Sequence, residues 1–326
     1  MDTYRKLLAS HDGLSKRMSY GRGLLERVRT AAAQRSTCSR NEICAYVAGS
    51  LGRLETGQIS DLDVFLFAHR KNKQVGERSI NRLEEILVLS ELIQVNSELS
   101  LPAFSGDGRY FKIHEVSELL AGTGTSIDDS ENLFTTRLLL LLESKCIVND
   151  ELYTEVTKET VDMYFRDGRG RKGYRPIFLL NDILRYWRTI CLNYERTRSD
   201  LGKPWWKKNL NLKFSRKLTV FSTILAILVD RIDTYAAFSN ISTLTPMERL
   251  AYALDKLDDN AYSSEFIVFL NNYEDFLAAK SHSELEELEP TNANIFSAKA
   301  QHFDDLLHSI FDSPKLDPQL VRYMLI

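Results

Sequence analysis

The sequence predicts an α+β protein, in which a small mixed β-sheet flanked by helices precedes an all-helical part. Two observations predict this class. Short apolar runs at residues 43–48 and 61–67 lie between segments whose apolar side chains have helical spacing. From residue 132 onward, nearly every segment has apolar residues at helical spacing. The chain therefore divides into a first domain, residues 1–125, and a helical second domain, residues 126–326.

The first domain is expected to alternate helices with short strands. An apolar run bounded by Gly, Ser or Asp indicates a buried strand, and apolar residues at every third or fourth position indicate a helix. The Gly-Asp-Gly sequence at residues 106–108 is typical of a hairpin turn. The expected elements are helices within 3–36 broken at Asp12-Gly13, strands at 43–48 and 61–67, an amphipathic helix at 79–92, and a hairpin over 99–116 whose second strand is 110–116.

The second domain is expected to be a succession of helices. Thr245 is a typical N-cap, Pro246 suits the first helical position, and Glu248 can complete a capping box. The expected helices cover residues 133–145, 152–165, 177–196, 216–232, 246–257, 264–279 and 294–310.

Composition excludes several classes of protein. The 326 residues, 44% hydrophobic and 27% charged, suit a globular protein rather than a disordered or fibrous one. The four cysteines form no CxxC or Cys/His metal pattern, which favours a reducing compartment. The charged N-terminus lacks the apolar core of a signal peptide, and the longest apolar stretch, residues 218–229, is too short to span a bilayer. We expect a cytoplasmic protein without a membrane partner.

Charge is unevenly distributed along the chain. The net charge is only −3, but residues 166–217 hold 15 Lys and Arg against 4 Asp and Glu. This basic block is expected to be either a solvated helix face or a site for polyphosphate or nucleic acid.

The segment that indicates chemistry links the two predicted strands. The first strand ends in Gly49-Ser50, and the second opens with Asp61 and Asp63. Residues two apart in a strand point to the same face, so both carboxylates project together. Like charges this close favour a cation between them, and magnesium prefers carboxylates together with substrate phosphates. A glycine lets backbone N–H groups approach a phosphate closely, and the serine hydroxyl adds a hydrogen bond.

These residues resemble the signature of the DNA polymerase beta-like nucleotidyltransferase superfamily. Gly49-Ser50-Leu51-Gly52-Arg53-Leu54-Glu55 and Ser60-Asp61-Leu62-Asp63 are most similar to the N-terminal domain of bacterial PII-protein uridylyltransferases and their shorter relatives. The resemblance implies that Asp61 and Asp63 bind magnesium, with two ions expected, and that Gly49 and Ser50 hold the triphosphate of an NTP. Arg53 either reaches a phosphate or pairs with Glu55.

The family also needs a third carboxylate, which shares a metal and activates the acceptor hydroxyl. The resemblance favours Asp107 as this catalytic, metal-binding residue, because His114 follows it at the spacing seen in the uridylyltransferase domain. Glu115 and Asp129 are the alternatives. The remaining histidines, His69 among them, have no ligand spacing and are expected to be surface or satisfied residues.

In such enzymes a helical domain closes over the nucleotide and neutralises the outgoing pyrophosphate. Lys213 and Arg216, and then Arg185, are the basic-block residues expected to do this. The aromatic residues among these charges either stack on a base or pack in the core: Tyr186, Trp187, Trp205 and Trp206.

The sequence therefore predicts a magnesium-dependent nucleotidyltransferase that moves an NMP from an NTP to an acceptor hydroxyl and releases pyrophosphate. The acceptor is a regulatory protein or an RNA, for example a tRNA 3′ end, and a small molecule stays open. The alternative is a non-catalytic nucleotide- or RNA-binding module on the same fold. Base preference, oligomeric state and physiological trigger are not indicated.

Overall fold

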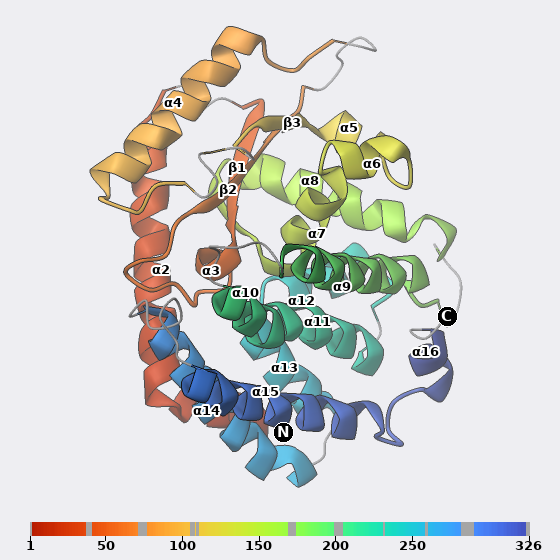
Figure 1. Ribbon diagram of the computed structural model, residues 1–326. Coiled ribbons are helices and arrows are strands. Elements are labelled where there is room, and N and C mark those ends of the chain that lie inside the picture. Colours follow the sequence, from red (N-terminus) through yellow and green to blue (C-terminus); the bar gives the residue numbers. More distant parts are fainter. Residues whose placement is uncertain are drawn as a thin grey trace. The chain divides into compact units, whose positions relative to one another are not determined.

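A computed structural model describes residues 2–36, 41–70, 77–104, 108, 111–168, 174–198, 205–230, 232–257, 260–281 and 290–323. The chain is α+β and forms two compact units, of which unit 2 is Arg17–Arg166 and unit 1 combines Met1–Lys16 with Asp167–Ile326 (Figure 1). The predicted domain boundary between residues 125 and 126 falls inside unit 2. The reason is that a strand and two helices beyond residue 125 pack on the sheet.

Unit 2 is built on a four-stranded mixed sheet in the order β3-β2-β1-β4. The central strands, β1 (Ile43–Ala48) and β2 (Asp63–Ala68), pair antiparallel and confirm the two predicted strands. On one side, β4 (Lys145–Val148) pairs antiparallel with β1. On the other, β3 (Ile113–Glu115) pairs in parallel with β2. The short edge strand β3 therefore has a non-local partner.

Strand β3 lies within the second strand predicted at 110–116, but the hairpin predicted over residues 99–116 is wrong within the described residues. Residues 101–104 form no strand, and the partner of β3 is β2 rather than the segment before the Gly-Asp-Gly turn. The strand β4 was not predicted either. Its short sequence directly follows a leucine-rich helix, and Ser144 turns the chain to extended conformation at φ −94° and ψ 152°.

The sheet has two buried faces because side chains alternate along its strands. The odd-numbered residues of β1 join a hydrophobic core with α2 (Asp12–Ala33) and α4 (Arg82–Glu98). On the other face, Tyr46 stacks on Phe65 with ring centroids 5.4 Å apart. Its hydroxyl donates to the carbonyl of Thr136, at 2.9 Å, on α7 (Leu133–Glu143). The neighbouring helix α8 (Asp150–Tyr164) contributes Tyr153 to this aromatic layer.

Three shorter helices complete unit 2: α3 (Gly49–Gly52), α5 (Val116–Ala121) and α6 (Ser126–Ser130). The helix α3 is a single turn that replaces the tight turn expected after the first strand. A salt bridge anchors α6 to α7, since the buried Asp128 carboxylate accepts two hydrogen bonds from Arg137, at 2.8 and 2.9 Å. Burial lowers the pKa of Arg137, but the hydrogen bonds to Asp128 and Tyr164 outweigh this effect and raise it.

Unit 1 is helical in the residues that the structure describes. Its helices are α1 (Thr3–Ser10), α9 (Ile177–Thr197), α10 (Trp205–Asn211), α11 (Lys217–Val229), α12 (Tyr235–Ser242), α13 (Pro246–Leu257), α14 (Ser263–Ser281), α15 (Pro290–Phe311) and α16 (Pro318–Tyr323), with a π-helical turn at Leu212–Arg216. The predicted capping box is confirmed, because the Thr245 N–H donates to the Glu248 carboxylate at 2.8 Å and the Glu248 N–H donates to the Thr245 hydroxyl at 3.3 Å. Helix α1 is tied to α13 because the Asp255 carboxylate accepts the backbone N–H of Tyr4 at 2.8 Å.

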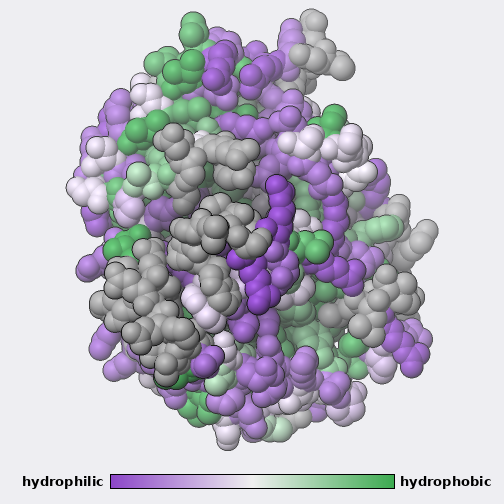
Figure 2. All heavy atoms as spheres, viewed as in Figure 1, coloured by the Kyte–Doolittle hydropathy of each residue, from purple (hydrophilic) through white to green (hydrophobic). Residues whose placement is uncertain are grey.

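The helices among the described residues are all too short or too polar to cross a lipid bilayer. Hydrophilic side chains cover much of the face drawn in Figure 2, and hydrophobic ones form separate patches. Helix α4 is less amphipathic than the sequence predicts, since it exposes four large apolar side chains: Leu83, Ile86, Leu87 and Ile93.

Gly52 is expected to be indispensable to the packing of α3 against α7. A Cβ at this position would lie 2.0 Å from the backbone oxygen of Glu143, which cannot move away as a flexible side chain could. The variant Gly52→Ala should therefore lower the free energy of unfolding by about 2 kcal/mol or more, measured by urea denaturation.

Gly23→Ala is the matched control, because Gly23 lies in helix α2 and a Cβ added there would meet no neighbouring atom within 4 Å. This change should leave stability unchanged or raise it by up to about 1 kcal/mol. Equal stability of the two variants would contradict the close approach of α3 to the end of α7.

Candidate functional site: the Gly-Ser turn and the aspartate pair

The site lies where β1 ends and β2 begins. The antiparallel register places Ala48 opposite Asp63, so the residue after β1, Gly49, lies beside the Asp63 side chain. Gly49 has a φ of +61°, a left-handed conformation that favours glycine. A Cβ on Gly49 would lie 1.9 Å from Oδ2 of Asp63. The Asp63 carboxylate therefore occupies the space that a side chain at residue 49 would fill.

Asp61 and Asp63 flank Leu62, whose side chain has a fixed direction. Leu62 is buried in the core that α2 and α4 share with the sheet. Strand β2 begins at Asp63, whose side chain points to the face opposite that core, and Asp61 precedes the strand, so its shared direction with Asp63 stays a prediction. Both residues are half-buried.

The turn after Gly49 rests on a buried group of three charges: Arg53, Glu55 and Glu143. Nε of Arg53 donates to Oε2 of Glu55 at 2.7 Å, and Nη1 donates to Oε2 of Glu143 at 2.7 Å. The Arg53 side chain is 3% exposed and that of Glu143 is 0% exposed. A guanidinium between two carboxylates satisfies charges that would be costly to bury alone.

This group of charges also positions the turn itself. The N–H of Gly49 donates to Oε1 of Glu143 at 3.2 Å, and the N–H of Glu55 donates to the carbonyl of Ser50 at 2.8 Å. Glu143 therefore connects the end of α7 to both Gly49 and Arg53. Of the two roles left open for Arg53, the structure shows the pairing with Glu55.

Glu143 is a residue of this site to which sequence reasoning assigned no role. It ends the run Leu138–Leu142 of a strongly apolar helix, where an ionised side chain is rare unless it is paired. That placement was the signal available in the sequence. Its partners, Gly49 and Arg53, lie about ninety residues earlier in the chain, where spacing gives no hint of the contact.

The donor set of this region fits a magnesium ion. Carboxylate oxygens, which Asp61 and Asp63 both supply, are the ligands that magnesium prefers. The glycine that lies against Asp63 leaves room for its carboxylate beside the turn. Asp61 and Asp63 are the described residues that would hold the ion.

The three candidates for the third carboxylate have different outcomes. Asp107 lies outside the described residues, so its role stays a prediction. Glu115 pairs with Ala68 at the far end of β2, and its carboxylate accepts hydrogen bonds from the N–H and hydroxyl of Ser79, at 2.8 and 2.7 Å. These hydrogen bonds hold the Glu115 carboxylate at Ser79 and not at the aspartate pair. Asp129 is exposed on α6.

His114, the residue whose spacing favoured Asp107, is buried in β3 opposite Phe67. Burial, assisted by the positive charge of Lys112, lowers the pKa of His114 to about 4, while the carboxylates of Glu131 and Glu85 oppose the shift. His114 is therefore neutral at physiological pH.

The predicted phosphate-binding residues of the basic block lie in unit 1. Arg185 is on α9, 3.9 Å from the carboxylate of Asp182, and Lys213 and Arg216 are in the π-helical turn. Nη1 of Arg216 donates to the hydroxyl of Tyr186 at 3.5 Å. Their role in phosphate binding stays a prediction.

The aromatic residues of the basic block differ in their surroundings. Tyr186 is buried, and Trp187 makes an edge contact with Phe221 at 5.4 Å, so both pack within unit 1. Trp206 is half-buried on α10, and the side chain of Trp205 lies outside the described residues.

Comparison of the chain with known proteins finds no matching family model and no similar curated protein.

Arg53→Gln should be strongly destabilising. The change leaves Glu55 and Glu143 buried without their cation, which costs about 3–5 kcal/mol in comparable cases. Urea denaturation at neutral pH measures the loss. As a control, Glu98→Gln removes a carboxylate that is 55% exposed from its ion pair with Arg35, and should change stability by less than about 1 kcal/mol. Similar effects of the two variants would argue against a buried charge group.

His114 should make the stability of the protein depend on pH. Its pKa is near 6.5 when the chain is unfolded and about 4 when folded, so between these values the unfolded chain alone binds the proton. The stabilising contribution is complete above pH 6.5 and is lost as the pH falls toward 4, with about 2 kcal/mol lost between pH 7 and 5.

Urea denaturation of wild type and His114→Gln at both pH values tests this expectation. The variant should lose less stability than wild type between pH 7 and 5. Parallel losses would show that His114 titrates alike in the folded and unfolded states.

Proposed function

We propose that unit 2 is a magnesium-dependent nucleotidyltransferase domain of the DNA polymerase beta-like superfamily, similar to the N-terminal domain of bacterial PII-protein uridylyltransferases. It would move an NMP from an NTP to an acceptor hydroxyl. One observation carries this proposal: the Asp63 carboxylate lies directly on Gly49 of the Gly-Ser turn. The groups needed for the metal and for the phosphates thus come from one small region.

The proposed reaction breaks a phosphoanhydride bond of the NTP and forms a phosphate ester bond to the acceptor. The acceptor oxygen attacks the α-phosphorus of the NTP, the bond to the bridging oxygen of the β-phosphate breaks, and pyrophosphate leaves. When bound, magnesium neutralises the phosphate charge that resists this attack. Asp61 and Asp63 hold it, and the predicted base, Asp107, accepts the proton of the acceptor hydroxyl.

The Gly-Ser turn would bind the triphosphate. The N–H of Gly49 already donates to Glu143, so we assign phosphate binding to the hydroxyl and N–H of Ser50. Arg53 is a positioning residue in this proposal, because its guanidinium pairs with Glu55 and Glu143. Arg185, Lys213 and Arg216 belong to unit 1 and are proposed to bind the phosphates of an RNA acceptor.

The acceptor is proposed to be a hydroxyl on a regulatory protein or on RNA. The resemblance to uridylyltransferases favours a protein, and the basic block favours RNA. RNA binding through phosphate contacts would weaken steeply with rising salt, because each contact releases counterions. A protein acceptor would show no such uniform dependence.

Incubation of the full chain with each α-labelled NTP, magnesium and a cell lysate tests the proposal. Label in protein, in RNA or in a small product identifies the acceptor. Asp61→Asn combined with Asp63→Asn should reduce labelling by about 1000-fold or more, since both metal-binding charges are lost. Thermal unfolding should show that this variant stays folded.

Asp150→Asn is the matched control, because the side chain of this aspartate of the same unit is 81% exposed and the variant should keep full activity. Undiminished labelling by the double aspartate variant would reject the mechanism. No label from any NTP would favour a non-catalytic nucleotide- or RNA-binding module.

A further inference from the structure

A second polar cluster lies at the opposite end of β2 from the aspartate pair. His69 directly follows the strand, and its N–H donates to the carbonyl of Glu42 at 2.8 Å. This bond continues the antiparallel pairing of β1 and β2 by one residue and fixes the backbone at His69. Because side chains alternate, His69 points to the same face as Phe65 and Phe67. Helix α8 covers that face.

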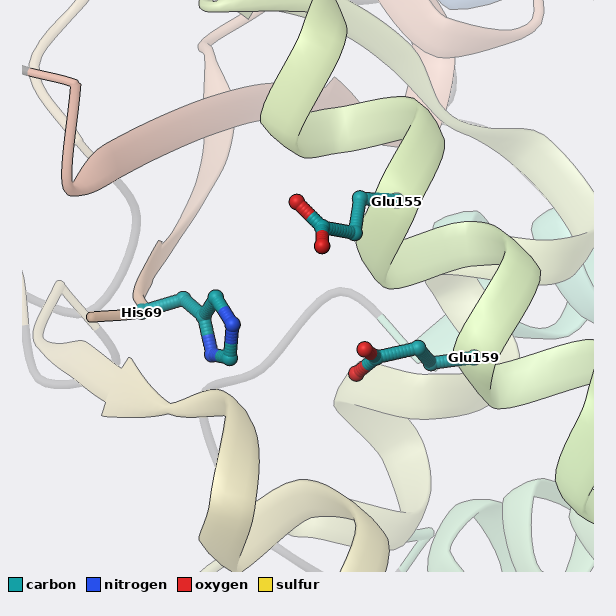
Figure 3. Close-up of side chains that lie close together, drawn as sticks. All are labelled: His69, Glu155 and Glu159. Carbon is teal, nitrogen blue, oxygen red and sulfur yellow. The ribbon is translucent and has the colours of Figure 1, made fainter. Parts of the chain in front are cut away.

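Two glutamates of α8 meet His69. Glu155 and Glu159 are one helical turn apart, so they project from the same side of α8. Figure 3 shows both carboxylates pointing from the helix toward the imidazole ring. One ligand atom of each residue lies within 4.8 Å of the others, and all three residues are half-buried. Sequence patterns do not indicate this cluster, because His69 and the glutamates lie on elements far apart in the chain.

The chemistry of the three side chains favours a transition-metal ion. An ion bound tetrahedrally at about 2.1 Å from each ligand atom holds these atoms about 3.4 Å apart, so small side-chain rotations would close the cluster. Two carboxylates at this helical spacing repel each other, and a cation between them removes the repulsion. An imidazole nitrogen is a ligand for zinc and its neighbours rather than for magnesium.

We propose that His69, Glu155 and Glu159 bind a divalent transition-metal ion of the zinc class. Three protein ligands leave a coordination position for water. The ion would clamp the end of β2 to α8 within unit 2. The cluster is distinct from the proposed magnesium site, because six residues of strand, about 20 Å, separate His69 from Asp63.

Calorimetric titration of the metal-free full chain with ZnCl₂ tests the proposal. Wild type should bind one zinc ion at this cluster, and millimolar MgCl₂ should not displace that ion. Zinc should also raise the unfolding temperature of the wild-type protein. His69→Ala should weaken this binding by about 100-fold or more, because a direct ligand is lost. Bound Co²⁺ should give wild type a visible absorption band that the variant lacks.

Glu159→Gln is a second variant that still tests the proposal if His69→Ala folds poorly. It should also weaken zinc binding. The matched controls, His308→Ala and Glu118→Gln, remove an exposed histidine and an exposed glutamate and should bind zinc as wild type does. Absence of zinc binding by wild type, or unchanged affinity in both cluster variants, would overturn the proposal. All variants keep Asp61 and Asp63, so this result is independent of nucleotidyl transfer.

Discussion

The buried group formed by Arg53, Glu55 and Glu143 is the constraint on which the candidate site depends. Each of these charges would be costly to bury alone, so the group is tolerated only while its hydrogen bonds are complete. Glu143 uses one carboxylate oxygen for Arg53 and the other for the N–H of Gly49. The end of α7, the turn after β1 and the loop toward β2 are therefore held in one arrangement. Because Gly49 lies against Asp63, the position of the acidic pair depends on a contact with α7.

Local patterns were sufficient to predict the central part of unit 2. The strands β1 and β2 are short, apolar and bounded by Gly, Ser and Asp, and both were predicted. At the two sides of the sheet, β3 lies within the strand predicted at 110–116 but has a different partner, and β4 was not predicted, because pairing depends on residues distant in sequence. The three residues of β3 pair with β2, and β4 returns to β1 directly after a leucine-rich helix. A helical pattern and a strand pattern cannot be separated over so few apolar residues.

The same distinction between local and distant contacts explains which parts of the candidate site could be predicted from the sequence. Alternation along a strand predicted that Asp61 and Asp63 share a face, and the burial of Leu62 agrees with it. The sequence left a pair between Arg53 and Glu55 open as one of two roles, and the structure shows this pair. Spacing in sequence could not indicate that Glu143 completes this pair, or that Glu115 is engaged by Ser79. Those contacts are made between elements, and only the fold brings their residues together.

One face of β2 accounts for both proposed ion sites. Along β2, every second side chain points away from the core of α2 and α4: Asp63 at the start, Phe65 and Phe67 in the middle, and His69 directly after the end. The rings of Phe65 and Phe67 pack with Tyr46 between the two polar ends. At about 20 Å, the ends are further apart than the screening length of physiological salt, about 8 Å. Each end can therefore hold its own cation without repelling the other, and the hard oxygen ligands at one end and the imidazole at the other select different metals.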